Sequence, residues 1–274
     1  MSNRRTVFFI SDRTGITVEM LGNSLLSQFE GIDFQRTTLP FVDTQDKIDE
    51  AVDQINRAGV RDGKRPIVLS SMVDDAMSAG LGRADALFLD FFQVFIAPLE
   101  AELNLKSTHA AGRSHGVANS NQYLARIDAI NYSLAHDDGQ TTKDLKNAQV
   151  ILVGVSRSGK TPTALYLALQ FGIRAANFPL TPDDFSDGKL PLSLKPYRDK
   201  LFGLTIRPDR LSRIRSERRP ESNYASLSNC QFEIREAEAM MQRVGIPVLD
   251  TTTRSIEEIA TTIVHHAKLA RHVF

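Results

Sequence analysis

Residues 154–161 form a motif of the kind that binds nucleotide phosphates, a P-loop. They read Gly-Val-Ser-Arg-Ser-Gly-Lys-Thr, which satisfies every specified position of the pattern G-x-x-x-x-G-K-[ST]. Glycines allow successive backbone N–H groups to turn towards phosphate oxygens, and a helix that begins at the motif adds its partial positive charge. Lys160 would bridge the phosphates, and the hydroxyl of Thr161 would bind Mg²⁺. The predicted nucleotide-binding residues are Gly154, Val155, Ser156, Arg157, Ser158, Gly159, Lys160 and Thr161.

Two pairs of aspartates could complete a phosphoryl-transfer site. Asp137 and Asp138 stand in an acidic turn, and Asp183 and Asp184 follow an expected strand on the C-terminal side of the motif. Phosphoryl transfer uses a carboxylate for the metal and one near the substrate hydroxyl to accept its proton. We therefore predict Lys160, Asp137 and Asp183 as the catalytic residues. Each aspartate pair could instead only cap a loop or a helix, and the sequence leaves that alternative open.

Six arginines lie between residues 207 and 219, offset only by Asp209 and Glu217. Such a stretch could close over nucleotide phosphates like the lid of a small kinase, dock an acidic protein partner, or form a solvated basic face. It has no interleaved aromatic side chains of the kind that stack on bases, which disfavours nucleic acid as the partner. The six are Arg207, Arg210, Arg213, Arg215, Arg218 and Arg219.

Two further segments have residues that could hold phosphate. The loop at 104–121 lacks periodicity and contains His109, Arg113 and His115, and long loops of this kind are often functional or join domains. The loop at 11–15 precedes an expected helix, whose N-terminus could bind an anion. A solvated linker and a plain strand-to-helix turn explain these two segments equally well.

The elements around the P-loop motif have the context that it requires. A buried-strand run at 149–153 precedes it, and apolar periodicity predicts a helix that follows it and stops at Gly172. Two more strands are expected at 174–178 and 200–206. Then come a helix at 225–244, a closing strand at 246–250 and a final helix at 255–270 that begins in a capping box.

The N-terminal half also alternates strands and helices. A β-branched and aromatic run predicts a strand at 6–10, helical periodicity follows at 16–25, and further strands are expected at 34–41 and 66–69. Such alternation is typical of βαβ units in a mostly parallel sheet. Residues 86–103 show one broad apolar stripe and predict a helix that packs in the core or in a homodimer.

The fold class predicted from these patterns is α/β, with two domains. Residues 1–140 would form an N-terminal domain of the βαβ type that contains the long loop 104–121. Residues 141–274 would form a P-loop kinase-like domain with a mostly parallel sheet.

Composition excludes several function classes. The 274 residues include 33 Lys and Arg and 33 Asp and Glu, and this zero formal net charge disfavours a globally basic nucleic-acid binder. Cys230 is the only cysteine, which excludes an intrachain disulfide framework and a cysteine-based zinc site. The apolar runs are too short for a signal peptide or a membrane span, so a cytoplasmic protein without membrane contact is expected.

Blocks of sequence spread over nearly the whole chain resemble the family of regulatory proteins that act on phosphoenolpyruvate synthase and on pyruvate phosphate dikinase. Examples are Ser-Asp-Arg-Thr-Gly-Ile-Thr-Val-Glu at 11–19 and Ala-His-Asp-Asp-Gly at 135–139. The P-loop alone is generic, whereas the blocks together are specific. They lie at residues 9–19, 39–41, 135–139, 154–167, 171–177, 193–196, 200–206 and 224–227.

The resemblance implies a bifunctional enzyme. Proteins of this family use ADP to phosphorylate a threonine of the target enzyme, which inactivates that enzyme. They also remove the phosphoryl group by transferring it to inorganic phosphate, which releases pyrophosphate. For this chain the resemblance implies ADP as phosphoryl donor, Mg²⁺, inorganic phosphate as co-substrate, and phosphoenolpyruvate synthase as protein partner. The nucleotide site would be residues 154–161, and the resemblance assigns no residue to the phosphorolysis step.

Three other interpretations stay open from the sequence. The same chemistry could act on pyruvate phosphate dikinase, the chain could be a small-molecule P-loop kinase, or it could be a nucleotide-gated binding protein without transfer activity. A labelled product on a protein, on a metabolite or on neither would separate these classes.

Overall fold

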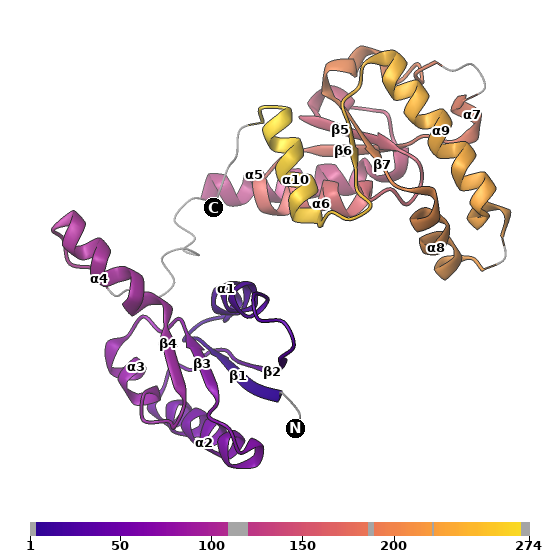
Figure 1. Ribbon diagram of the computed structural model, residues 1–274. Helices are drawn as coiled ribbons and strands as arrows, with labels where there is room; N and C mark the ends of the chain where they lie inside the picture. Colours follow the sequence, from indigo (N-terminus) through magenta and orange to yellow (C-terminus); the bar gives the residue numbers. More distant parts are fainter. Residues whose placement is uncertain (1–3, 109–119, 186–188, 221, 270–274) are drawn as a thin grey trace. The chain divides into compact units, whose positions relative to one another are not determined.

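The computed structural model describes residues 4–108, 120–185, 189–220 and 222–269 (Figure 1). The chain divides into two compact units, Met1–Gly116 and Val117–Phe274. Each unit is built on a four-stranded sheet, and every strand pairing among the described residues is parallel. The α/β fold class predicted from the alternation of strands and helices is therefore confirmed.

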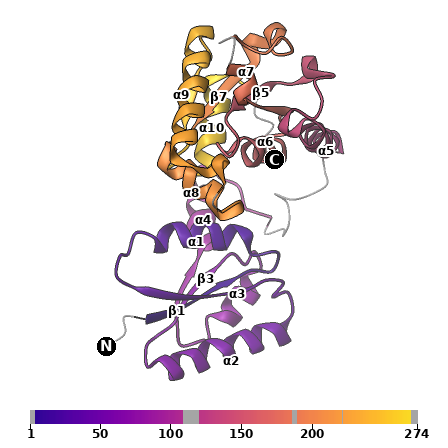
Figure 2. The same ribbon diagram turned by 90° about the vertical axis from the view of Figure 1, so that its right-hand side faces the viewer.

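The first unit has the strand order β2-β1-β3-β4. Its central strand β1 is apolar on both faces: Val7 and Phe9 pack with α1, whereas Phe8 and Ile10 pack with α2. Figures 1 and 2 show α1 on one face of this sheet and α2 and α3 on the other. The elements are β1 (Arg4–Ile10), α1 (Ile16–Leu26), β2 (Asp33–Leu39), α2 (Gln45–Asp62), β3 (Ile67–Ser70), α3 (Asp75–Leu81), β4 (Leu87–Asp90) and α4 (Phe91–Leu103).

The prediction of one continuous helix over 86–103 is wrong at its start. Residues 87–90 form β4, which pairs with β3, and α4 begins only at Phe91. The Asp90 carboxylate caps this helix by accepting from the N–H groups of Phe92 (2.9 Å) and Gln93 (3.0 Å). Because the apolar residues at 87 and 88 satisfy both the strand and the helix period, the pattern alone could not separate the two elements.

Helix α4 packs against the core of its own unit at its first residue, Phe91. None of its residues is buried, and Phe95 and Leu99 are 59% and 56% exposed. Core packing is therefore confirmed only where the helix begins, and a homodimer contact through the rest of this helix stays a prediction.

The second unit has the strand order β6-β5-β7-β8. On one face of β5, Val150 and Leu152 pack with α6 and α10, and on the other Ile151 and Val153 pack with α9. Successive side chains of this buried strand point to opposite faces of the sheet, and each face is covered by helices. The elements are α5 (Ser120–Ala135), β5 (Val150–Gly154), α6 (Lys160–Phe171), β6 (Ala175–Pro179), α7 (Pro182–Phe185), β7 (Leu201–Thr205), α8 (Pro208–Arg218), α9 (Leu227–Val244), β8 (Val248–Asp250) and α10 (Ile256–His266), with short 3₁₀ turns η2 (Asp137–Gly139), η3 (Leu145–Asn147), η4 (Lys195–Lys200) and η5 (Asn223–Ala225).

Helix α5 lies with the second unit, although the sequence analysis placed the domain boundary after it, between residues 140 and 141. The helix packs against α6 and β6, and the hydroxyl of Ser133 accepts from the N–H of Ala175 at 3.3 Å. Residues 109–119, which include His109, Arg113 and His115 of the long loop, lie outside the described part of the chain.

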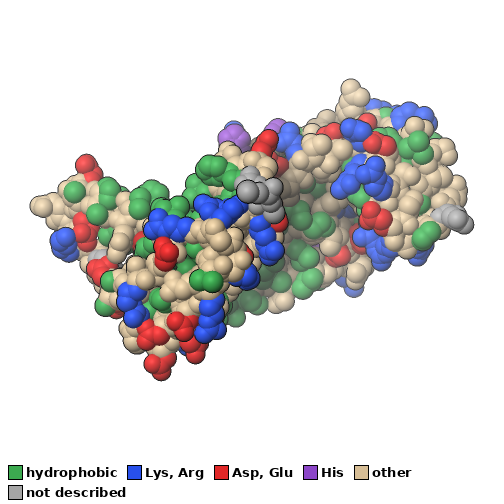
Figure 3. Space-filling view, turned by 60° about the horizontal axis from the view of Figure 1, so that its bottom comes forward, with side chains coloured by type: hydrophobic (Ala, Val, Ile, Leu, Met, Phe, Trp, Pro, Cys, Tyr) green, Lys and Arg blue, Asp and Glu red, His purple; other side chains and the backbone are tan. Residues whose placement is uncertain are grey.

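The surface carries both signs of charge. Figure 3 shows Lys and Arg side chains interspersed with Asp and Glu on one face, together with exposed hydrophobic side chains. Within the described ranges, no helix combines the length and apolar character that crossing a bilayer requires.

Candidate functional site

The P-loop lies at the carboxyl end of β5, where the chain enters α6. The chain runs from β5 to β6 on one side and places β7 on the other, so the strand order reverses at β5. In open parallel sheets, the crevice at such a switch point is where ligands bind. The helix that begins at Lys160 directs its N-terminus at this crevice.

Two glycines and one strained residue give the loop its tight curve. A Cβ on Gly154 (φ 151°) would overlap the carbonyl oxygen of Leu204 in β7. Gly159 (φ 93°) precedes the first residue of α6 in a left-handed conformation. Arg157 has a φ of 74°, which is unfavourable for a residue with a side chain. Strain of this kind is held where a loop is shaped for a ligand.

Lys160 lies inside the loop rather than in solvent. Its side chain is 3% exposed, and its Nζ donates to the carbonyl oxygen of Val155 at 2.8 Å. Burial lowers the pKa of Lys160 from 10.5 to about 8, although the carboxylates of Asp138 and Asp137 act in the opposite sense. An anionic ligand in the loop would supply the counter-charge that this ammonium group lacks.

Asp137 and Thr161 meet at the mouth of the loop. The Thr161 hydroxyl donates to Asp137 Oδ1 at 2.7 Å, and the buried Asn177 donates its amide Nδ2 to the same oxygen. The Asn177 Oδ1 accepts from the N–H of Asp138 at 2.9 Å. Asn177, on β6, thereby fixes the position of the acidic turn relative to the loop.

The acidic turn has a rigid support. The ring nitrogens of His136 contact the carbonyl oxygens of Tyr132 (2.8 Å) and Lys143 (2.7 Å), and the ring stacks on Tyr132 with centroids 3.9 Å apart. The carbonyl oxygen of His136 accepts from the N–H of Asn177 at 3.1 Å. The carboxylate that faces Thr161 is therefore presented by a turn held on both sides.

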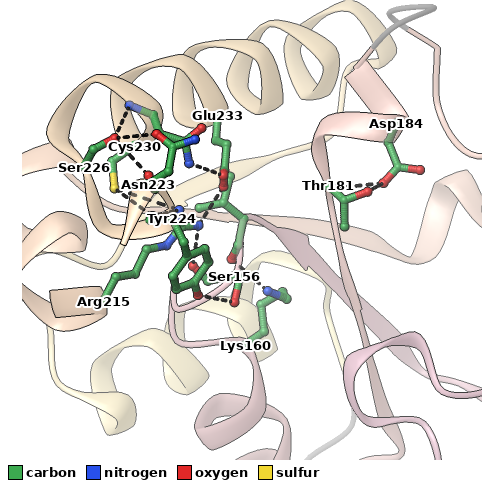
Figure 4. Close-up of polar contacts among 12 residues, drawn as sticks. Ser156, Lys160, Thr181, Asp184, Arg215, Asn223, Tyr224, Ser226, Cys230 and Glu233 are labelled. Atoms are coloured by element: carbon green, nitrogen blue, oxygen red, sulfur yellow. Dashed lines mark hydrogen bonds and ion pairs between the residues drawn. The ribbon is translucent and has the colours of Figure 1, made fainter. Parts of the chain in front are cut away.

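Side chains from α8 and η5 contact the loop at Ser156, and α9 supports them through Glu233 (Figure 4). Arg215 is fully buried and donates to Glu233 at 2.6 Å, to the carbonyl oxygen of Ser156 at 3.1 Å and to that of Tyr224 at 3.0 Å. The Tyr224 hydroxyl is 2.9 Å from the Ser156 hydroxyl. On another side, the Thr251 hydroxyl donates to the carbonyl oxygen of Ser158 at 3.1 Å.

A cavity of about 500 Å³ opens in front of the loop. Such a volume suits a small-molecule ligand. Helix α8 supplies part of its wall, so the basic stretch reaches the cavity as the lid interpretation expects, although Arg215 is buried behind the loop. The lining residues are Asp138, Ser156, Arg157, Gly159, Lys160, Thr161, Pro162, Ile214, Arg218, Arg219 and Tyr224.

The predicted site residues do not all lie together. Thr161 and Asp137 meet at the loop, whereas Asp183 is on α7; of the four aspartates in the two pairs, Asp138 is the one that lines the cavity. Its neighbour Asp184 accepts from the N–H and the hydroxyl of Thr181, both at 2.8 Å, and Figure 4 shows this pair apart from Lys160. A catalytic role for Asp183 stays a prediction.

The sequence analysis missed three residues that shape the site: Asn177, Tyr224 and Glu233. Asn177 gave a signal, because an amide within the apolar run Ala-Ala-Asn-Phe must find a partner when that strand is buried. Glu233 gave none, since it acts through Arg215, whose burial is set by the packing of α8 on α9. Tyr224 gave none either, since its contacts with Arg215 and with the Ser156 hydroxyl both depend on where that packing places η5.

The donor set at the loop mouth fits Mg²⁺. This ion is held in phosphoryl-transfer sites by one or two protein oxygens together with substrate phosphates. The Thr161 hydroxyl and the Asp137 carboxylate provide such a pair 2.7 Å apart. Elsewhere too, the described residues contain no cluster of three His, Cys, Asp or Glu able to hold a metal.

Comparisons with known proteins agree with the sequence resemblance. A family model described as kinase/pyrophosphorylase matches residues 7–264. A protein of Alkalilimnicola ehrlichii is 57% identical over 271 residues, which are 99% of this chain and 98% of the relative. Proteins of Aromatoleum aromaticum (58% over 271 residues, 98% of each chain) and Burkholderia multivorans (56% over 269 residues, 98% of this chain and 99% of the relative) are similar throughout. All three bear the name "Putative phosphoenolpyruvate synthase regulatory protein".

Proposed function

The chain belongs to the kinase/pyrophosphorylase family, and from that membership we propose that it is a bifunctional regulator of phosphoenolpyruvate synthase. In one reaction the β-phosphoryl group of ADP passes to a threonine hydroxyl of the synthase: the bond from the β-phosphorus to the bridging oxygen breaks, AMP leaves, and the hydroxyl proton goes to a carboxylate. In the other reaction inorganic phosphate attacks the phosphothreonine. The threonine oxygen takes back a proton and pyrophosphate leaves.

The observation that carries this proposal is a single loop with one hydroxyl–carboxylate pair at its mouth. The second reaction is the reverse of the first with inorganic phosphate in the place of AMP. ADP and pyrophosphate share a diphosphate group, so one diphosphate-binding loop can serve both reactions. The Thr161 hydroxyl and the Asp137 carboxylate, 2.7 Å apart, would offer metal-binding oxygens at one end of such a group.

The residues of the cavity would act by position and charge, because phosphoryl transfer asks little covalent chemistry of the protein. Lys160 and the backbone N–H groups of the loop bind the diphosphate. Thr161 and Asp137 would hold Mg²⁺, which neutralises phosphate charge when bound. Asp138, which lines the cavity, would accept the threonine proton, while Arg218 and Arg219, which line it at the C-terminal end of α8, would face the phosphates.

The direct test is mass spectrometry of purified phosphoenolpyruvate synthase after incubation with this protein and ADP, and then with phosphate. We expect one threonine to gain a phosphoryl group in the first step and to lose it in the second, with release of pyrophosphate. Pyruvate phosphate dikinase tested in parallel decides the target. A labelled metabolite without labelled protein would establish the small-molecule kinase, and binding without any product would establish the nucleotide-gated binding protein.

ADP binding is expected to weaken as the pH rises above about 8, because Lys160 then loses its proton in the free protein. Each further pH unit should raise the Kd about tenfold, until the pKa of Lys160 in the complex is reached. Isothermal titration calorimetry over a pH series measures this dependence. Buffers of different ionisation enthalpy should also reveal proton uptake on binding at high pH.

The same group predicts the pH dependence of stability, with a sign that can be checked. The folded chain holds Lys160 with a lowered pKa, so between pH 8 and 10.5 the unfolded chain binds more protons. The contribution of Lys160 to the free energy of unfolding should therefore rise over this range. Lys160→Met is the control, since it should remove both this rise and the pH dependence of the Kd. A Kd in this variant that still rises above pH 8 as in the natural protein would assign the dependence to another group.

A further inference from the structure

The buried guanidinium of Arg215 is tied to the loop and to two other elements at once. Its Nη2 donates to Glu233 on α9 and to the carbonyl oxygen of Ser156, and its Nη1 donates to the carbonyl oxygen of Tyr224. The second oxygen of Glu233 is taken by Asn229 Nδ2 at 2.7 Å. A charge this deeply buried is retained only when its partners are fixed, so the group is a rigid joint between α8, α9 and the loop.

The bond to Ser156 determines which way the loop backbone faces. In a trans peptide the carbonyl oxygen and the next N–H point in opposite directions, and the described chain has no cis peptide. Because the Ser156 carbonyl oxygen points towards the Arg215 guanidinium, the N–H of Arg157 must point away from it. The Thr251 hydroxyl lies between the carbonyl oxygens of Ser158 (3.1 Å) and Thr205 (3.0 Å), and so supports the Ser158 oxygen on the side opposite to the N–H of Gly159. The two contacted carbonyls thus leave the N–H groups of Arg157 and Gly159 directed away from their supports, where a phosphate could accept from them.

Tyr224 adds a second link from the same joint to the loop. The guanidinium of Arg215 lies over its ring, 4.1 Å from the centroid, and its hydroxyl contacts the Ser156 hydroxyl. Tyr224 also lines the cavity. Both the backbone and the side chain of Ser156 are therefore held from the side of α8.

Helix α8 presents two further arginines to the cavity at its C-terminal end. Arg218 is the last residue of α8 and Arg219 follows it, and both line the cavity. Their position depends on where Arg215 anchors the helix. A ligand that contacts both the loop and these arginines would therefore stabilise α8 through the same joint.

We propose that Arg215 and Tyr224 are positioning residues that aim the loop amides at the phosphates and couple occupancy of the loop to the stability of helix α8. This inference rests on the proposed binding of a diphosphate at the loop. The arginines of the basic stretch would then have two separate roles. Arg215 acts indirectly, by positioning the loop, while Arg218 and Arg219 contact the ligand in the cavity.

The test compares Tyr224→Phe, which removes one hydroxyl, with Tyr197→Phe, a matched change in η4 of the same unit. Arg215→Lys, which keeps the charge and loses the fork, is compared with Arg213→Lys on the exposed side of α8. Binding of ADP with Mg²⁺ is measured by calorimetry. Amide hydrogen exchange of residues 208–218 is measured with and without saturating ADP, and thermal unfolding reports on the fold.

We expect Tyr224→Phe to raise the Kd for ADP roughly two- to tenfold, as the loss of one hydrogen bond implies, and Arg215→Lys to raise it by at least as much. ADP should slow exchange in α8 of the natural protein and of both controls, and should do so much less in the two test variants. An unchanged Kd and undiminished protection of α8 in Tyr224→Phe would overturn the inference, whatever the effect on thermal stability. If the natural protein itself failed to bind ADP, the proposed function would be the part that fails.

Discussion

Lys160→Ala is expected to slow phosphoryl transfer from ADP to the target protein by about 10²–10³-fold, the usual effect of removing one fixed donor to a developing charge. The ammonium group lies within the loop, 2.8 Å from the Val155 oxygen and almost fully out of water. In such a site its charge acts on the transferring group with little screening. The initial rate of threonine phosphorylation, measured at saturating ADP, gives the effect.

The fold should survive this substitution. Burying the Lys160 charge opposes folding, as the lowered pKa shows, so its removal takes away an unfavourable term along with one hydrogen bond. Lys160→Arg keeps a charge but places a larger planar group in the loop, and we expect it to recover only part of the rate.

Lys200→Ala is the matched control for a lysine that binds backbone oxygens. Lys200 Nζ donates to the carbonyl oxygens of Lys146 (2.7 Å) and Ala148 (2.9 Å), near the start of β7 and therefore at the opposite end of the strands from the loop. Its loss should reduce stability and leave the transfer rate nearly unchanged. Similar rates for Lys160→Ala and the natural protein would remove Lys160 from the mechanism.

The loop and its carrier strand could be located from the sequence because their constraints are local. Gly154 and Gly159 are demanded by backbone conformation and close approach, and the strand and helix on either side follow from short-range periodicity. The strand at 87–90 could not be separated from the helix after it, since Leu87 and Phe88 suit both periods. Only pairing with β3 decides that assignment, and pairing is not local.

The partners of the loop are long-range and were therefore predicted only in part. Asp137 was one of the candidate carboxylates, and it lies beside Thr161. Its position in the sequence did not favour it over Asp183, because 24 residues separate it from Thr161. Arg215 was one of six arginines whose sequence context looks alike. Its burial against Glu233, 18 residues on, depends on the packing of two helices rather than on either sequence pattern.

Asp137→Asn is the second substitution with a large expected effect. The change keeps the shape of the side chain and one oxygen acceptor for Thr161, while it removes the negative charge at the loop mouth. A metal ligand or its immediate support loses about 10²-fold or more in activity when its charge is removed. We therefore expect a fall of this size in the rate of threonine phosphorylation, together with a higher Mg²⁺ concentration for half-maximal rate.

A second readout follows from the electrostatics of the same carboxylate. The Asp137 charge raises the pKa of Lys160 against the effect of burial. Without it, Lys160 should lose its proton below pH 8, and the pH at which ADP binding begins to weaken should move down. Loss of a residue that only stabilised the fold would not shift the pH at which ADP binding begins to weaken. A shift in this pH, together with the higher Mg²⁺ requirement, would therefore identify charge as the function of Asp137.

Asp183→Asn makes the same chemical change at the other aspartate predicted from sequence. Asp183 lies on α7, whereas the carboxylate that the Thr161 hydroxyl contacts is that of Asp137. We therefore expect loss of the Asp183 charge to leave unchanged both the Mg²⁺ dependence and the pH at which ADP binding begins to weaken. If Asp183→Asn were instead the variant that shifted both, the metal-binding carboxylate would belong to α7. The contact between Thr161 and Asp137 would then only cap the first turn of α6. Two substitutions that are identical in chemistry and differ only in position therefore decide which carboxylate binds the metal.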